Sequence, residues 1–314
     1  FSFTSINIYA DDNIETIIVT GTRIPTNISE SLSAVSVLQR ADIERYQASD
    51  IFELLSRVPS VSFVRNGGRG SSTSMSLRGN QSDHSLFLID GVRIGSATSG
   101  GATLASLNMS TVERIEVIRG PKSNLYGADA IGGVVNIITR KTSEPSTLSV
   151  QTSFGSNNTN ETTVFAGANG DYYGFTVAAN KLDSDGTDST ASTEGVHGDK
   201  DAFSKDSIAL NYHYQIADNA LWKVVYNQSK TQADYDNNCS VGSRPDRYSV
   251  DCNIYTLGQV DSLSTAIDYK VSEQWHSTFQ LGRSHDEGLE AAHNVDLATT
   301  NNGGEFNTMK TEAT

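Results

Sequence analysis

The half of the chain after Arg140 predicts a series of β-strands joined in turn by short and long connections. Apolar and polar residues alternate along about eight runs, as in strands with one apolar face. The runs are 147–155, 161–168, 173–182, 207–215, 221–232, 257–271, 274–284 and a last one from 305. The turns 169–171, 217–219 and 272–273 are tight, whereas the connections 183–206, 233–255 and 285–304 are long and polar. This inequality is typical of a transmembrane antiparallel β-barrel, so the predicted fold class is mainly β.

Alternation alone also fits a soluble two-layer sandwich, and only the unequal connections separate the two folds. The predicted barrel is truncated, with about 8 of the about 22 strands of the large barrels. An eight-stranded barrel that closes on itself is the alternative. We therefore expect a fragment cut at both ends, with 1–10 as the remnant of a secretory signal peptide and Asp11 as the first mature residue.

The first part of the chain predicts a compact α+β unit. Its region 41–57 has helical spacing, and Asp50 stands three residues before Glu53, which predicts the N-cap of a second helix that stops at Val58-Pro59. Gly132-Gly133 marks a turn or a close approach of another backbone segment. Strands are expected at 33–39, 61–65, 115–118 and 134–138.

The amino-acid sequence of this unit resembles that of the plug domain of TonB-dependent outer-membrane receptors. The stretch 118–139, IRGPKSNLYGADAIGGVVNIIT, is similar to the last third of that domain, and SLRG at 76–79 and LIDGV at 88–92 are similar to two earlier plug signatures in the expected order. Among these receptors the chain most resembles those for vitamin B12 (cobalamin). The resemblance implies an N-terminal plug (11–142) inside a partial barrel (143–314). It also implies energy-coupled corrinoid uptake across the outer membrane of a Gram-negative bacterium.

A short β-prone run at 14–21 follows acidic residues near the N-terminus. It fits an ordinary edge strand. The resemblance implies instead a TonB box, the segment that pairs by strand addition with a TonB-type periplasmic energy-transducing protein. The residues predicted to bind this partner are Glu15, Thr16, Ile17, Ile18, Val19, Thr20 and Gly21.

Two loops rich in small residues, 66–74 and 95–105, stand in the predicted plug. A phosphate-binding loop is a poor interpretation of the first, because the Gly-Lys-Ser/Thr ending is missing. The resemblance implies that both loops face outward and contact a corrinoid, although merely flexible loops would have the same composition. The implied substrate-binding residues are Asn66, Ser71, Ser72, Ser99, Gly100, Ala102 and, further along the chain, Tyr235.

Aspartates crowd the two connections 183–206 and 233–255, and the net charge of the whole chain is −14. This charge argues against nucleic acid as a partner, because phosphate neutralisation needs an excess of Lys and Arg. A hard cation such as calcium would relieve the repulsion between the carboxylates; a solvated acidic surface is the alternative. The resemblance implies calcium at Asp188, Asp199, Asp201, Asp236 and Asp251, where it would order the loops around the substrate.

Cys239 and Cys252 lie in one polar segment without the spacing of a zinc or redox motif. They predict a disulfide in an oxidising compartment, with two unpaired thiols as the alternative. No nucleophile elbow or other catalytic constellation is present, so we do not expect an enzyme. A ferric siderophore or haem receptor of the same fold, and an outer-membrane adhesin that binds a protein, are the alternative functions.

Overall fold

The computed structural model describes most of the chain. The described residues are 18–19, 26–28, 31, 33–48, 50–65, 68–71, 73–95, 104–127, 129–142, 145–187, 200–241, 248–272, 275–292, 300–301 and 304–313. For 18–19, 26, 105, 236–241, 248–254, 290–292, 300–301 and 304–313 the description covers the backbone only. None of the described helices is long and apolar enough to cross a membrane.

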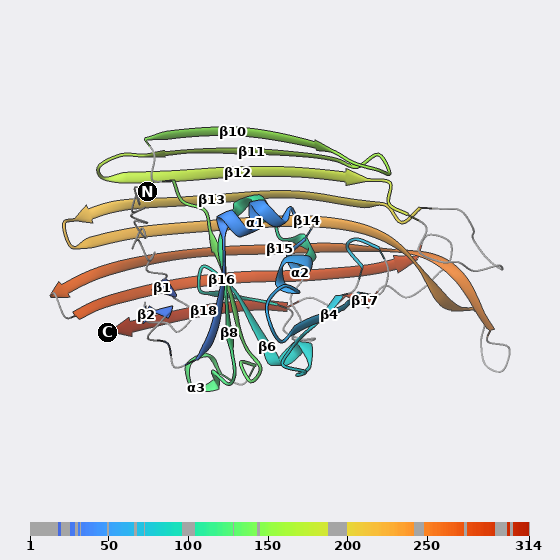
Figure 1. The fold of residues 1–314 in the computed structure, drawn as a ribbon, viewed down its shortest axis with the longest axis horizontal. Coiled ribbons are helices and arrows are strands. Elements are labelled where there is room, and N and C mark those ends of the chain that lie inside the picture. Colours follow the sequence, from blue (N-terminus) through green and yellow to red (C-terminus); the bar gives the residue numbers. More distant parts are fainter. Residues whose placement is uncertain are drawn as a thin grey trace, which may run out of the picture.

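A long curved sheet makes up the second half of the structure (Figure 1). Neighbouring strands in it are antiparallel, and the order follows the sequence from β10 to β17, with β18 also paired to β16. The strands are β10 (Ser146–Phe154), β11 (Asn160–Asn169), β12 (Tyr173–Ser184), β13 (Phe203–Ala217), β14 (Ala220–Val241), β15 (Tyr248–Ser272), β16 (Trp275–Ala292), β17 (Thr300–Asn301) and β18 (Gly304–Ala313). The predicted mainly β class is confirmed.

The strands run further into the long connections than the sequence predicted. Pairing between β14 and β15 continues to Val241 opposite Tyr248, and β16 continues to Ala292. The predicted long loops 233–255 and 285–304 are therefore wrong in extent. The error has a physical cause: strand propensity was judged by apolar alternation, whereas backbone pairing can continue through polar residues once a strand has left an apolar environment. The connection 185–202 remains long, as predicted.

The plug unit is built on a five-stranded sheet with the order β3-β8-β9-β6-β7. Its strands are β3 (Ala34–Gln39), β6 (Ser85–Ile89), β7 (Val92–Ile94), β8 (Val112–Arg119) and β9 (Gly133–Thr139). β6 and β9 are parallel and the other neighbours are antiparallel. A separate hairpin joins β4 (Val61–Arg65) to β5 (Thr73–Leu77), and β1 (Ile18–Val19) pairs with β2 (Thr26–Asn27).

Two helices cover this sheet, α1 (Arg40–Tyr46) and α2 (Ile51–Leu55). They are separated by a left-handed residue, Gln47, and α2 is capped as predicted, because the Asp50 side chain accepts a 3.0 Å hydrogen bond from the Glu53 N–H. The short elements are η2 (Ser82–His84), η3 (Leu104–Ser106), η4 (Met109–Thr111) and α3 (Ser123–Tyr126).

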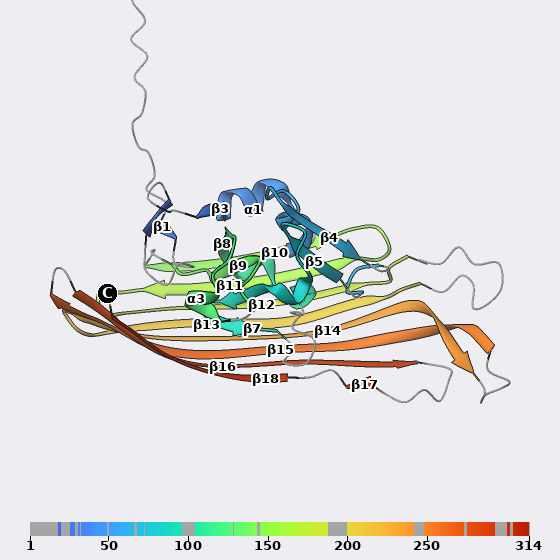
Figure 2. The same cartoon turned by 90° about the horizontal axis from the view of Figure 1, so that it is seen from below.

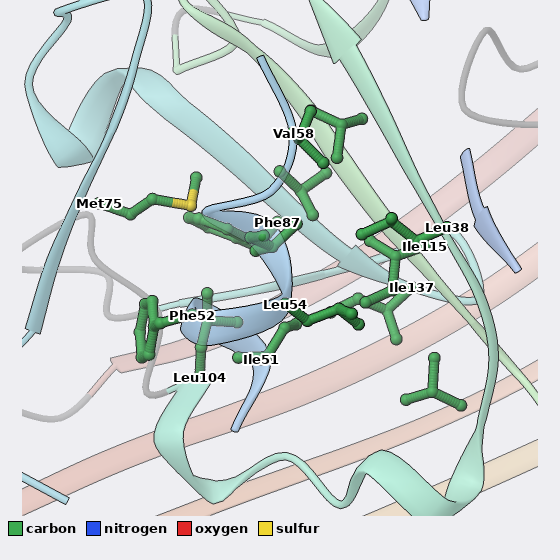
Figure 3. Packing of buried hydrophobic residues seen from close by; sticks show 14 of the residues in the cluster. Leu38, Ile51, Phe52, Leu54, Val58, Met75, Phe87, Leu104, Ile115 and Ile137 are labelled. Carbon is green, nitrogen blue, oxygen red and sulfur yellow. The ribbon is translucent and has the colours of Figure 1, made fainter. Parts of the chain in front are cut away.

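An apolar core holds the helices against the plug sheet (Figure 3). Ile51, Leu54 and Leu55 of α2 are fully buried and pack with Ile115 of β8 and Ile137 of β9. The predicted close approach at Gly132-Gly133 is confirmed, since a Cβ on Gly133 would lie 2.2 Å from the Ile118 carbonyl oxygen. The plug unit thus has a core of its own.

The plug unit lies on the concave side of the curved sheet (Figure 2). Side chains on the sheet alternate accordingly: along β12 every second residue is buried against the plug side, and the residues between them are exposed or partly exposed. This arrangement places plug loops and strand ends directly against the inner face of the sheet, where the candidate site is found.

Candidate functional site

The β6–β7 hairpin of the plug rests on β16. Asp90 and Gly91 connect the two strands with positive φ at both positions, as in the tight turn that favours Asp-Gly. Gln280 on β16 donates a 3.0 Å hydrogen bond to the Asp90 carbonyl oxygen, and Ser284 donates one of 2.6 Å to the Arg93 carbonyl oxygen. Between them stands Gly282, where an added Cβ would lie 2.7 Å from the Val92 side chain. Three alternate residues of β16 therefore form a seat for this hairpin.

Other sheet residues also donate to carbonyl oxygens of the plug. Ser229 on β14 donates to Ser106, and Lys205 on β13 donates over 3.4 Å to Leu107. Thr176 on β12 donates over 3.1 Å to the carbonyl oxygen of Arg140. These bonds end on the plug backbone, so this part of the seam between the two units is polar and does not depend on plug side chains.

The end of β9 is tied to β13 through side chains. The Thr139 hydroxyl lies 2.6 Å from the Asp90 carboxylate and 3.0 Å from the Asn211 amide nitrogen. Asn211 also donates to the Arg140 carbonyl oxygen over 3.0 Å, and the Arg140 guanidinium stacks 3.9 Å above the Phe165 ring of β11. Here the plug is held by hydrogen bonds and by one cation–π contact.

A cavity of about 690 Å³ borders this point, between the plug and strands β13 to β16 at the end with the short turns. Burial raises the pKa of the Asp90 carboxyl, and hydrogen bonds from Thr139 oppose that shift. Burial lowers the pKa of the Lys141 ammonium, and the nearby Asp90 opposes it. Lys223 and Asp268 form an ion pair in the cavity wall. The charged lining indicates a hydrated space beneath the plug.

The first predicted substrate loop lies at the opposite end, where the long connections are. Gly70, with φ +85°, packs so closely on Phe203 of β13 that a Cβ would lie 2.5 Å from the ring. Ala233, the register partner of Phe203, stands beside the same glycine. Ser71 is buried, and its hydroxyl donates to the Gly68 carbonyl oxygen over 2.8 Å. This hydrogen bond stabilises the loop and uses the proton of the hydroxyl. Tyr235 lies on β14, two residues beyond Ala233.

The other predicted substrate residues lie outside the described residues, and their role stays a prediction: Asn66, Ser72, Ser99, Gly100 and Ala102. The predicted calcium ligands are described only in part. Asp201 is buried where the 185–202 connection reaches β13, Asp236 and Asp251 are described by backbone alone, and Asp188 and Asp199 lie outside the description. Among the described residues, no group of three metal-ligating side chains comes together.

Backbone pairing still brings parts of the acidic segments together. Asp236 lies opposite Asn253 and Asp251 opposite Asn238, so the two aspartates occupy paired strands two register positions apart. They are therefore strand residues, not loop residues as predicted. The Asp234 N–H donates to the Ala202 carbonyl oxygen over 2.9 Å, which fixes the chain next to Asp201 against β14.

The remaining predicted sites are seen only as backbone. In the TonB-box prediction, Ile18 and Val19 form β1, and Glu15, Thr16, Ile17, Thr20 and Gly21 lie outside the described residues. Cys252 is opposite Asn237 and Cys239 is opposite Val250. The two cysteines are thus diagonal neighbours on paired strands, a separation at the upper limit for a disulfide. The disulfide stays a prediction.

Sequence reasoning did not find the seam between plug and sheet. Asn211 alternates with Leu210 and Tyr212 within the predicted strand 207–215, which puts it on the opposite face, yet nothing local shows that this face meets Thr139. A usable signal was the polar inner face itself, because serine, threonine and asparagine repeat there in positions that a soluble sandwich would fill with apolar residues.

Comparison with known proteins agrees with this architecture. Residues 27–134 match the family model of the TonB-dependent Receptor Plug Domain. The Vitamin B12 transporter BtuB of Vibrio cholerae serotype O1 is 34% identical over 269 residues, which cover 85% of this chain and 42% of the relative. The chain thus spans less than half the length of the curated relatives that it matches.

Solved structures show the same fold at low sequence identity. The ferric enterobactin receptor PfeA of Pseudomonas aeruginosa, a double mutant, has a TM-score of 0.64 at 19% identity and covers 95% of this chain and 47% of its own. The siderophore receptor PiuA of Acinetobacter baumannii has a TM-score of 0.63 at 17% identity, with 84% and 38% covered. With its plug domain seated on a partial antiparallel barrel, the chain belongs to the TonB-dependent receptors.

Proposed function

We propose that this chain is part of an outer-membrane receptor for energy-coupled uptake of cobalamin or a related corrinoid. One observation supports the proposal most: a plug domain that is hydrogen-bonded to the concave face of the sheet occurs in a chain 34% identical to a vitamin B12 transporter. The solved siderophore receptors are less than 25% identical and support the fold alone.

In this proposal the substrate enters from the side of the long connections. The loop that contains Gly70 and Ser71, held against Phe203, would offer small groups and backbone to a bulky ligand from the plug side. Tyr235 would add an aromatic surface from β14. The hydrogen bonds across the seam are separate contacts, each with a net contribution of about 1 kcal/mol, so they can be broken in sequence when a periplasmic partner pulls on the 15–21 segment.

Calcium is proposed as the structural ion of the outer segments. The chemistry of the donors fits, because aspartate oxygens are the ligands that this hard cation prefers. The backbone also brings Asp201 next to β14, which carries Asp236, and pairs β14 with the strand that carries Asp251. Asp188 and Asp199 would complete the set. The bound ion would hold these segments together and lower the entropic cost of closing on substrate.

The test is corrinoid binding by the full-length receptor in detergent, measured with calcium and with chelator. We expect the dissociation constant to rise about tenfold or more with chelator, and to rise similarly in Asp201→Asn with calcium present. Asp206→Asn is the matched control, because Asp206 is an exposed aspartate on β13, five residues further along the chain.

The outcomes separate the parts of the proposal. Corrinoid binding that is indifferent to chelator and to Asp201→Asn would remove the calcium ion but keep the substrate. Absence of corrinoid binding together with binding of a ferric siderophore or haem would overturn the substrate assignment and leave the family unchanged.

A further inference from the structure

The end of β9 is held to the sheet by a chain of three polar side chains, Asp90, Thr139 and Asn211. Asp90 stands in the β6–β7 turn, where its carboxylate accepts from the Thr139 N–H over 3.2 Å and lies 2.6 Å from the Thr139 hydroxyl. That hydroxyl in turn lies 3.0 Å from the Asn211 amide nitrogen of β13. One plug turn, one plug strand and one sheet strand therefore meet at a single hydroxyl group.

The number of protons decides the direction of these bonds. A threonine hydroxyl carries one proton, and an ionised carboxylate can only accept. With Asp90 ionised, Thr139 donates to the carboxylate, and its oxygen accepts from the Asn211 amide nitrogen. The Asn211 amide oxygen also lies 3.2 Å from this hydroxyl, which then has no second proton to donate to it. The Asn211 amide nitrogen also bonds the Arg140 carbonyl oxygen.

The contact between Asp90, Thr139 and Asn211 borders a cavity. Asp90, Thr139 and Asn211 all line the cavity of about 690 Å³, so their contact stands at the edge of an open space. The backbone of Asp90 is held at the same point, because Gln280 of β16 donates to its carbonyl oxygen. The charged neighbours Lys141, Lys223, Asp268 and Glu113 lie around the same cavity.

We propose that Asp90, Thr139 and Asn211 form a plug-anchoring relay, in which Asp90 is the positioning residue that sets the direction of the Thr139 hydroxyl. Because the Asp90 carboxylate accepts the proton of the Thr139 hydroxyl in a hydrogen bond, the hydroxyl oxygen can bond only a donor from β13, and Asn211 is that donor. The relay keeps the plug closed at the edge of a hydrated cavity. When it is broken, the end of β9 keeps the Thr176 bond and the Arg140–Phe165 stack but loses its attachment to β13, and the cavity widens.

The test is passive entry of vancomycin, a bulky glycopeptide antibiotic, into Gram-negative cells that make the full-length receptor. Asn211→Asp places a second acceptor opposite Thr139, whose only proton is already used, and should raise entry about fivefold to tenfold. Asp90→Asn combined with Asn211→Asp reverses the relay, because Asn can donate to the hydroxyl and the hydroxyl can then donate to the sheet. We expect this pair to leak less than Asn211→Asp alone.

Asp171→Asn is the control, since Asp171 is exposed in the turn between β11 and β12 at the same end of the sheet, and should leave entry unchanged. The substitution at Asn211 lies outside the plug, so a leak there does not reflect a misfolded plug. Entry at the wild-type level in Asn211→Asp, or a double variant that leaks as much as Asn211→Asp, would overturn the relay. The measurement needs no corrinoid, so its outcome does not depend on the proposed substrate.

Discussion

The plug and the sheet distribute polarity in opposite ways. In the plug, apolar side chains such as Leu54 and Ile115 are fully buried in a common core (Figure 3). On β15 the order is reversed: Ser262 and Ser264 face the plug and are buried, whereas Leu263 between them is 50% exposed. The plug can therefore fold as a water-soluble unit does, while the sheet needs an apolar surrounding outside and a polar partner inside.

This difference shows how a stably folded plug can be attached to the sheet by contacts that are easily broken. Burial of apolar area stabilises the plug internally and is lost only when the plug unfolds. Across the seam the contacts are mostly single hydrogen bonds from side chains such as Thr176 and Ser284 to plug carbonyl oxygens. Each of these bonds contributes about 1 kcal/mol, so they can be broken one at a time.

The largest effect is expected inside the plug. Leu54→Ala should lower the free energy of unfolding of the plug by about 2–5 kcal/mol, because the fully buried site cannot collapse around the lost methyl groups. Urea unfolding of the full-length receptor, followed by a probe attached to the plug, measures this loss. Leu148→Ala, at a side chain 76% exposed on β10, is the control; equal losses at both positions would contradict the assignment of a separate plug core.

A charge on the outer face of the sheet should have the next largest effect. Leu263→Lys places an ammonium group on the apolar face and should destabilise the barrel in lipid by about 2–4 kcal/mol if the site is near the middle of the membrane. Folding of the full-length receptor into vesicles, titrated with urea, measures this change. Ser262→Lys at the neighbouring inward position tests the polarity directly: a larger loss for Leu263→Lys than for Ser262→Lys in lipid but not in aqueous refolding supports the reversed arrangement.

The smallest effect is expected at the seam. Thr176→Val removes one hydrogen bond to the Arg140 carbonyl oxygen while keeping the shape of the side chain, and should weaken attachment of the plug by about 1 kcal/mol. Hydrogen exchange at residues 139–142 in the full-length receptor should rise about fivefold. Thr152→Val on the edge strand β10 is a matched control, because Thr152 is exposed. A loss as large as that for Leu54→Ala would show that the seam is not made of separable contacts.

Much of the fold could be predicted from the sequence because its signals are local. The N-cap at Asp50, the close approach at Gly133 and the cores of the strands from β10 to β16 were all predicted correctly. The extension of β14 and β15 through polar residues was missed, because pairing between strands continues there without an apolar face. Most of the predicted ligand residues were expected in loops of the plug and in the connection after β12, where local patterns place no side chain.

The sequence by itself determined that the chain contains an α+β plug and a series of long β-strands. The alternation of apolar and polar residues shows which faces are apolar, and the turn residues show where strands end. It also determined the family, through plug signatures that stand in order along 76–139. Only the tertiary structure decided which polar residues meet. Asp90, Thr139 and Asn211 are far apart in sequence, and their hydroxyl, carboxylate and amide become one contact only when the plug rests on the concave face of the sheet. Such long-range contacts depend on the relative placement of whole elements, which no local pattern encodes.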